Sequence, residues 1–276
     1  MAVPFLPLPQ KLTPQAAADY LEGCVPPHRL PTWEPILAHL RAASPARPES
    51  GRPLAEVVAT PLGLWLLRTV YIERNSDPAP LLHRERFPTP GALRDHLFDR
   101  LIDALIDARP PLDGPEKNAD RFRPRRHRDP RQVRAWLGYL ARLLSDQDTR
   151  DLAWWRLPTA VPAPASLFKY VTGFMGGLAA GLVGGLASGL TFGGHRAWSM
   201  YLVASWWWTW KNLLPRRLMP FLDDCHRLGL LRAIGPIYQF RHAEFQDYLA
   251  ADHRRAHGTT GGSRAGEETA SENAGR

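Results

Sequence analysis

The chain has 276 residues, of which 44% are hydrophobic and 22% are charged, and its net charge is +8. This composition excludes an intrinsically disordered chain that is too polar to form a hydrophobic core, and the length allows one or two domains. Two cysteines, Cys24 and Cys225, are too few for a disulfide framework and fit a reducing cytosol. The first ten residues lack the basic start and unbroken apolar stretch of a signal peptide, so none is expected.

Residues 1–74 are expected to be helical. Thr13-Pro14 has the form of a helix start, because Thr can cap the first turn and Pro fits the first position. We expect this helix to end at Gly23. Apolar residues then recur at helical spacing in two stretches, around Trp33 and between Leu54 and Val70. Pro61 should break the second stretch into two helices.

Residues 85–157 predict two more capped helices. Thr89-Pro90 precedes an apolar stripe with a 3.6-residue period, and Asp129-Pro130 opens the next helix. Between the two helices, Asp113–Arg128 is a polar loop that contains the basic run Arg121–Arg128. This run either lies in solvent or contacts anionic lipid headgroups.

Residues 167–214 predict a transmembrane hairpin. No charged residue occurs from Val171 to Gly194, which is long enough for a helix to cross about 30 Å of hydrocarbon. Glycines four residues apart would let two helices approach closely. The tryptophan-rich stretch Ala197–Leu214 either spans the bilayer or lies at its surface. The alternative for the first stretch is a glycine-rich linker.

Residues 215–256 predict a helix, a β-hairpin and a second helix. The amphipathic helix Pro215–Leu228 should end at Gly229, and two β-prone runs meet at the turn signal Gly235-Pro236. The final helix contains Phe245. A helix, a two-stranded wing and a closing helix are the order of a winged-helix domain. Residues 257–276 are small and polar, and we expect them to be disordered.

The sequence offers no catalytic constellation. It contains no phosphate loop of the form GxxxxGK[ST], no CxxC pair and no HExxH motif. Asp223-Asp224 with His226 has the residue types of a metal site, but on an amphipathic helix such residues are more often a solvated face. We therefore predict a chain that is not an enzyme and has no metal site.

The segment from Tyr238 to Ala251 carries the most specific pattern, F-x-H-x-x-F-Q-D-Y-L-A-A. It resembles the end of the winged-helix domain in NACHT-type signalling NTPases of the STAND class. Five further stretches resemble parts of such proteins, in the family's order: Leu8–Leu21 (start of the helical lid), Ala59–Leu64 (the lid's Pro-Leu motif), Arg94–Asp99 and Trp136–Ala141 (first helices of the winged-helix domain), and Arg217–Asp224 (similar to actinobacterial members with membrane segments).

The resemblance implies the C-terminal half of a nucleotide switch that lacks its P-loop core. In the family, a lid proline packs on the adenine and a winged-helix histidine reaches the ADP phosphate. These roles carry over to Pro61 and His242, which would bind ADP or ATP only if a partner supplies the core. Alternatively, Pro61 only kinks a helix and His242 only caps one.

The predicted fold class is mainly α: a helical lid and a winged-helix domain interrupted by a transmembrane helical hairpin, with one short β-hairpin. The predicted parts are the lid (1–74), the two pieces of the winged-helix domain (85–157 and 215–256), the hairpin (167–214) and the tail (257–276). Because both winged-helix pieces must meet on one side of the bilayer, the chain should cross it an even number of times. Flanking basic residues, among them Arg150 and Lys211, place both soluble parts in the cytoplasm, at the cell membrane.

The expected function is that of a non-catalytic, membrane-anchored regulatory half of a NACHT-like signalling protein, related to defence by resemblance alone. Its expected partners are the membrane, a P-loop-containing chain or missing N-terminal half, and further copies of itself. Two alternatives stay open. One is a membrane adaptor without nucleotide dependence. The other is a membrane-tethered DNA-binding regulator that uses Arg216, Arg217 and Arg227, although nucleic acid is not an expected partner.

Overall fold

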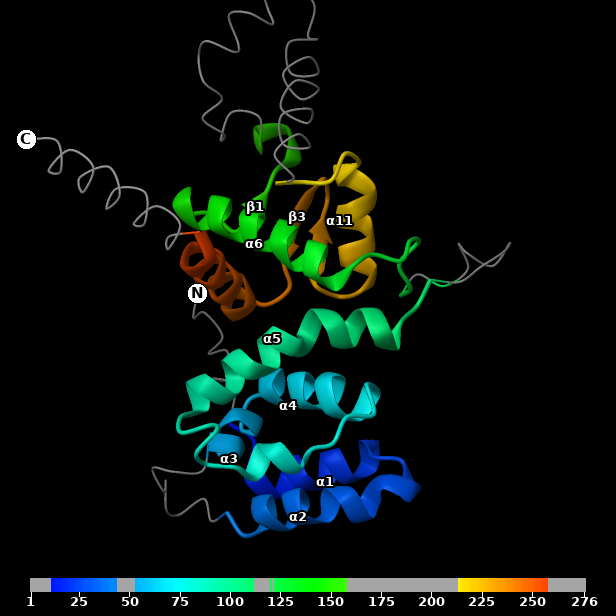
Figure 1. Ribbon diagram of the computed structural model, residues 1–276, viewed down its shortest axis with the longest axis vertical. Helices are drawn as coiled ribbons and strands as arrows, with labels where there is room; N and C mark the ends of the chain where they lie inside the picture. Colours follow the sequence, from blue (N-terminus) through cyan, green and yellow to red (C-terminus); the bar gives the residue numbers. More distant parts are fainter. Residues whose placement is uncertain (1–10, 44–52, 112–119, 121, 158–212, 258–276) are drawn as a thin grey trace, which may run out of the picture. The chain divides into compact units, whose positions relative to one another are not determined.

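The computed structural model describes residues 11–43, 53–111, 120, 122–157 and 213–257 (Figure 1). The chain divides into two compact units, unit 1 within Met1–Pro111 and unit 2 within Leu112–Arg276. The helices and the sheet of each unit are considered separately below.

Unit 1 begins with two helices that lie side by side, α1 (Pro14–Cys24) and α2 (Leu30–Arg41), joined by the 3-10 turn η1 (Pro27–Arg29) (Figure 1). The predicted cap is confirmed, since the Thr13 side chain accepts a hydrogen bond from Ala16 N. α1 runs through Gly23 instead of ending before it. The predicted apolar face of α2 is fully buried: Trp33, Ile36, Leu37 and Leu40.

The predicted break at Pro61 is also confirmed. It separates α3 (Pro53–Val58) from α4 (Pro61–Leu67). The two helices approach so closely that a Cβ atom on Gly63 would lie 1.9 Å from the Val57 carbonyl oxygen. Only glycine fits at this position without displacing backbone.

The remaining elements of unit 1 follow from α4. The chain continues from α4 into a π-helix, η2 (Arg68–Glu73), and after a short 3-10 turn, η3 (Ala79–Leu82), it enters α5 (Pro90–Ala108). Thr89 caps α5 through a hydrogen bond from Ala92 N. The predicted apolar stripe of α5 is buried against α3, α4 and η2.

Unit 2 contains α6 (Pro130–Asp146), β1 (Asp151–Leu152), the 3-10 turn η5 (Trp154–Arg156), α11 (Leu218–Arg227), β2 (Leu231–Ile234), β3 (Ile237–Phe240) and a helix over 243–257. The three strands form one antiparallel sheet in the order β1-β3-β2. The β2–β3 hairpin is the predicted one, with Gly235 at φ +58° in its turn. The sequence analysis missed β1, which is only two residues long.

Segments far apart in the sequence meet in unit 2. Asp151 of β1 pairs with Gln239 of β3, 88 residues later. α6 is joined to the helix over 243–257 by an ion pair at 3.0 Å between Arg134 and Asp252, and Arg134 also donates to the Tyr248 hydroxyl. Residues 122–157 and 213–257 therefore fold together. α5, by contrast, belongs to unit 1, although the domain prediction grouped it with α6.

The end of α11 fixes the position of the hairpin that follows it. Gly229 adopts φ +81°, a left-handed conformation that suits glycine at a helix C-terminus. Its N–H bonds the His226 carbonyl, and the Leu230 N–H bonds the Cys225 carbonyl at 3.0 Å. These two hydrogen bonds close the last turn of α11, and the chain then enters β2.

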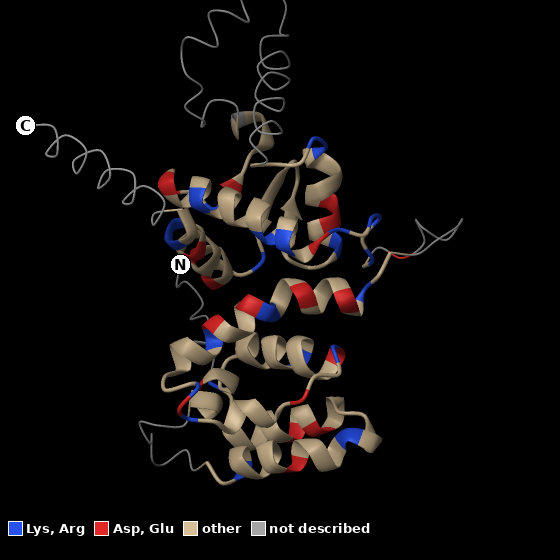
Figure 2. Cartoon of the chain, viewed as in Figure 1, with Lys and Arg blue, Asp and Glu red and all other residues tan. Residues whose placement is uncertain are grey.

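The transmembrane part of the predicted fold class is contradicted. Among the described residues, no helix has both the length and the apolar character that crossing a membrane requires. α5 is the longest of them at 19 residues, and charged side chains occur along its length (Figure 2). Such side chains are costly in hydrocarbon. The predicted hairpin over 167–214 falls outside the described residues except for its last two.

The structure therefore corrects the fold class to a mainly helical chain with one small antiparallel sheet, and the predicted cell-membrane location is not kept. Leu214, the last residue of the predicted hairpin, is buried in unit 2. The predicted disorder of the tail concerns residues 258–276, which also lie outside the described part of the chain.

Candidate functional site

Pro61, the first predicted site residue, lies at an exposed turn of unit 1. It is the first residue of α4, directly after the cap Thr60. The Thr60 hydroxyl donates to the Val57 carbonyl at 3.0 Å and accepts from Gly63 N at 3.1 Å. Pro61 thus lies exposed at the corner between α3 and α4, which the hydrogen bonds of Thr60 fix.

His242, the second predicted site residue, lies in unit 2 between β3 and the helix over 243–257. Its carbonyl accepts a hydrogen bond from Gln246 N, which places His242 at the beginning of that helix. Burial lowers the pKa of the half-buried imidazole, and the nearby Arg241 lowers it further, while Glu244 raises it. The lowered pKa favours the neutral form of the ring at pH 7, and a neutral imidazole carries one N–H donor.

The residues around His242 are held by packing and hydrogen bonds. Phe240 and Phe245 are buried and contact each other with ring centroids 6.3 Å apart. The Gln246 amide donates to the Thr149 carbonyl, and Arg150 donates to the Ala243 carbonyl at 3.0 Å. The apolar positions of the F-x-H-x-x-F-Q-D-Y-L-A-A pattern therefore form core, and its histidine is placed at the edge of that core.

Pro61 and His242 belong to different units, so each is described only in its own surroundings. The simpler interpretations that the sequence left open agree with these positions, since Pro61 starts a helix and His242 precedes one. What distinguishes His242 is the combination of a neutral imidazole with the N-terminus of a long helix. Helix N-termini are places where phosphate oxygens commonly bind.

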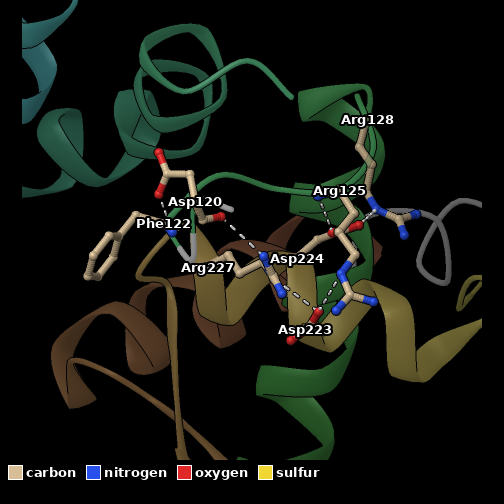
Figure 3. Close-up of polar contacts among 7 residues, drawn as sticks. All are labelled: Asp120, Phe122, Arg125, Arg128, Asp223, Asp224 and Arg227. Carbon is tan, nitrogen blue, oxygen red and sulfur yellow. Dashed lines mark hydrogen bonds and ion pairs between the residues drawn. The ribbon is translucent and has the colours of Figure 1, made fainter. Parts of the chain in front are cut away.

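A second cluster joins the basic run to α11 (Figure 3). We name Asp120 and residues 122–128 the strap. The Asp224 carboxylate accepts hydrogen bonds from Arg125 N at 2.8 Å and from Arg128 Nε at 3.0 Å. The Asp224 side chain is 2% exposed and that of Arg128 is 16% exposed. This is a buried ion pair between segments 96 residues apart.

The neighbouring carboxylate, Asp223, makes more exposed contacts with the same two segments. It pairs with Arg227 at 3.1 Å and with the Arg125 guanidinium at 3.5 Å. Arg227 also donates to the Asp120 carbonyl (Figure 3). The strap is therefore fastened at several points along α11.

The strap also contacts the apolar core of unit 2. The Arg128 guanidinium lies over the Phe221 ring, 5.4 Å from its centroid, and Trp136 of α6 meets the same ring edge-on at 5.2 Å. The sequence analysis treated this run as a solvated or lipid-bound loop. The structure shows that Arg125, Arg126 and His127 are exposed, and that the run is also bonded to α11 through Asp224. The sequence signal that could have predicted this contact is the acidic pair Asp223-Asp224, whose negative charge complements the arginines of the run.

These contacts account for the residues that had suggested a metal site. Both aspartates bind arginines, and His226 Nδ1 lies 3.1 Å from the Leu231 carbonyl oxygen. In the described ranges, no group of three or more His, Cys, Asp or Glu side chains is arranged to hold a metal ion. Burial raises the pKa of the Cys225 thiol, which keeps it protonated and unreactive.

The strap also bears on the DNA-binding alternative. A recognition helix in the major groove presents its side chains to bases and phosphates. In α11, Arg227 is turned toward Asp223 and the Asp120 carbonyl, and one side of the helix is covered by the strap. Arg216 and Arg217 are exposed but precede the helix. α11 thus presents no row of basic side chains to a groove.

A further ionisable pair lies at the other end of the helix over 243–257. The His253 and His257 rings stack with centroids 4.1 Å apart, and His257 Nδ1 lies 3.0 Å from the His253 carbonyl oxygen. Burial lowers the pKa of His253 to about 4, and His257 and Arg142 contribute to the shift. A Cβ atom on Gly138 of α6 would lie 3.3 Å from His253 Cβ, so α6 approaches this pair closely.

We compared the chain with models of protein families, with curated proteins and with solved structures, and nothing matches it in any of the three. The interpretation of its function therefore depends on its own residues and on the motif resemblance described above.

Proposed function

We propose that this chain is a non-catalytic regulatory part of a nucleotide-switch signalling protein, similar to the part that follows the nucleotide core in NACHT-type NTPases. In this proposal it contacts ADP or ATP that a phosphate-loop core holds. His242 donates a hydrogen bond to a phosphate oxygen, and Pro61 packs on the adenine. The observation that carries the proposal is the neutral imidazole of His242 at the start of the helix over 243–257.

The chemistry at His242 supports a phosphate contact. A neutral imidazole donates one N–H without the desolvation cost of a full charge. The first N–H groups of the adjoining helix face the same end, and Arg241 adds a cation next to the ring. Since Phe240 and Phe245 are buried on either side of His242 in the sequence, the backbone that carries the ring is anchored at both ends.

The arrangement of the elements in unit 2 supports the same proposal. α6, β1, α11, the β2–β3 wing and the helix over 243–257 occur in the order of a winged-helix domain, with β3 central in the sheet. The strap covers α11, which favours a regulatory role for this domain over DNA reading.

Nucleotide titration tests the proposal. The full-length chain is titrated with ADP by calorimetry, alone and mixed with a phosphate-loop domain supplied as a separate chain. We expect binding in the mixture, with the Kd for ADP raised about tenfold or more by His242→Ala, because a hydrogen bond to a charged group contributes about 1.5–3 kcal/mol. His28→Ala, which changes an exposed histidine outside the strap, is the matched control and should leave the Kd unchanged.

The opposite result would support an adaptor without nucleotide dependence. In that case the mixture would bind ADP with the same Kd whether the chain is wild type, His242→Ala or absent. Hydrogen exchange of the helix over 243–257 should be the same in wild type and variant, which shows that a changed Kd does not come from unfolding.

A further inference from the structure

We propose that the strap is a latch that relays the state of the His242 site: a ligand at His242 changes how firmly the strap is held on α11, through Asp224. The ligand in this inference is the nucleotide of the proposed function, on which the second half of the inference rests. The latch itself depends only on the contacts of unit 2.

The latch is built around one buried carboxylate. Asp224 is 1% exposed, and the strap supplies both of its hydrogen-bond donors described above, Arg125 N and Arg128 Nε. If the strap moved away, a buried carboxylate would lose its partners, which is strongly unfavourable. In the proposed latch, the strap is either fastened through these two hydrogen bonds or released from them.

α11 passes the state of Asp224 to the wing. Asp224 lies within α11, and the end of this helix is bonded to Leu231 of β2 and to Leu230, the residue before it. His226 Nδ1 lies 3.1 Å from the Leu231 carbonyl oxygen, and Leu230 N donates to the Cys225 carbonyl at 3.0 Å. A rotation or shift of α11 therefore moves the start of β2.

The wing carries the change on to His242. Leu231 of β2 pairs with Phe240 of β3, and Arg241 N donates to the Leu230 carbonyl at 3.0 Å. The next residue is His242. Hydrogen bonds and the backbone that joins them thus form a route from the strap to the backbone of His242. Such a route is a physical basis for coupling, and coupling itself has to be measured.

The position of the strap in the sequence gives the latch a use. The strap lies within the connection from α5, which ends at Ala108 in unit 1, to α6, which begins at Pro130 in unit 2. In the proposed latch, its fastening therefore sets how firmly this connecting segment is held on α11.

Amide hydrogen exchange at Arg125 tests the latch in the full-length chain without nucleotide. The Arg125 side chain is 52% exposed, so protection of its backbone N–H reports mainly the bond to Asp224. We expect exchange at least about 100-fold slower than in an unstructured chain. Asp224→Ala should speed exchange at Arg125 at least about tenfold. Asp223→Ala removes the adjacent, more exposed carboxylate and should change it by less than about twofold.

Exchange within α6 shows whether Asp224→Ala still folds. If this variant unfolds unit 2, Arg128→Gln takes its place, since it removes only one donor to Asp224. Unprotected Arg125 in the wild-type chain, or equal exchange in wild type and the folded Asp224 or Arg128 variant, would overturn the latch.

The coupling is tested in the mixture of the chain with the phosphate-loop domain. ADP should change the exchange rate at Arg125 at least about threefold, and Asp224→Ala should change the Kd for ADP by a similar factor, because coupling free energies are reciprocal. His242→Ala should abolish the effect of ADP on Arg125. If ADP binds through His242 and Arg125 exchange is unaffected, the relay is wrong and the proposed function stands. If ADP does not bind at all, the proposed function and the relay both fail, while the latch without nucleotide stands or falls by its own result.

Discussion

The contacts that stabilise unit 1 internally differ in sequence range from those that stabilise unit 2. In unit 1, α1, α4 and α5 start at threonine caps, and helices close in the sequence pack on each other, such as α2 on α1 and α4 on α3. In unit 2, the decisive contacts join residues about 90 to 100 positions apart, namely the β1–β3 pairing and the bond between the strap and Asp224. Local signals therefore explain unit 1, and complementary distant residues explain unit 2.

The largest expected effect tests the close helix packing of unit 1. Gly63→Ala would place a Cβ atom 1.9 Å from the Val57 carbonyl oxygen, so α3 and α4 must separate. We expect unit 1 to lose about 3 kcal/mol or more of its free energy of unfolding, measured by denaturant titration. Gly23→Ala is the control. No atom lies within 4 Å of its added Cβ, and the helix should gain up to about 1 kcal/mol.

The next effect tests the distant contact in unit 2. Asp224→Ala leaves the Arg128 guanidinium and the Arg125 N–H without their acceptor, and we expect unit 2 to lose about 2 to 3 kcal/mol of its free energy of unfolding. Asp223→Ala breaks a more exposed pair and should cost less than about 1 kcal/mol. Equal losses in the two variants would show that the burial of Asp224 does not matter.

A smaller effect tests the local caps. Thr89→Ala removes the side-chain acceptor for Ala92 N at the start of α5 and should cost about 1 kcal/mol. Thr89→Ser keeps the hydroxyl and should recover most of the loss. If Ser and Ala have the same effect in thermal unfolding, the hydrogen bond of the cap contributes nothing to unit 1.

The smallest expected effect is the change with pH in the contribution of His253 to the free energy of unfolding of unit 2. Its folded pKa, about 4, lies below the ordinary value of 6.5, so the folded chain binds this proton less readily than the unfolded chain. The contribution of His253 to stability is thus complete above pH 6.5 and is lost as the pH falls toward 4. Denaturant titrations from pH 7.5 to 4.5 should show this loss in the wild type and a weaker one in His253→Gln.

The comparison also shows what the sequence could and could not predict. The caps Thr13, Thr89 and Asp129 were readable because the polar cap and the proline after it are adjacent in the sequence. The hairpin between β2 and β3 was readable from its turn residues. β1 was not, because two residues carry no alternation and acquire strand geometry only by pairing with Tyr238 and Gln239.

The candidate site was predicted in part. His242 was selected by a motif resemblance, and the structure adds its place at a helix start and the lowered pKa of its imidazole. The fastening of the strap was missed because no local pattern links Arg128 to Asp224 across 96 residues. The transmembrane fold and the membrane location were inferred from the hydropathy of one segment. The described helices contradict both, since no described helix is long and apolar enough to cross a membrane.

The central claim is that His242 donates to a nucleotide phosphate, and nuclear magnetic resonance of its imidazole tests this most directly. The full-length chain, labelled at histidine, is mixed with the phosphate-loop domain and titrated with ADP. We predict that one imidazole signal, assigned by its absence in His242→Ala, shifts on ADP binding, and that the signal of His28, an exposed histidine outside the strap, does not move. An unchanged His242 signal at ADP saturation would contradict the claim.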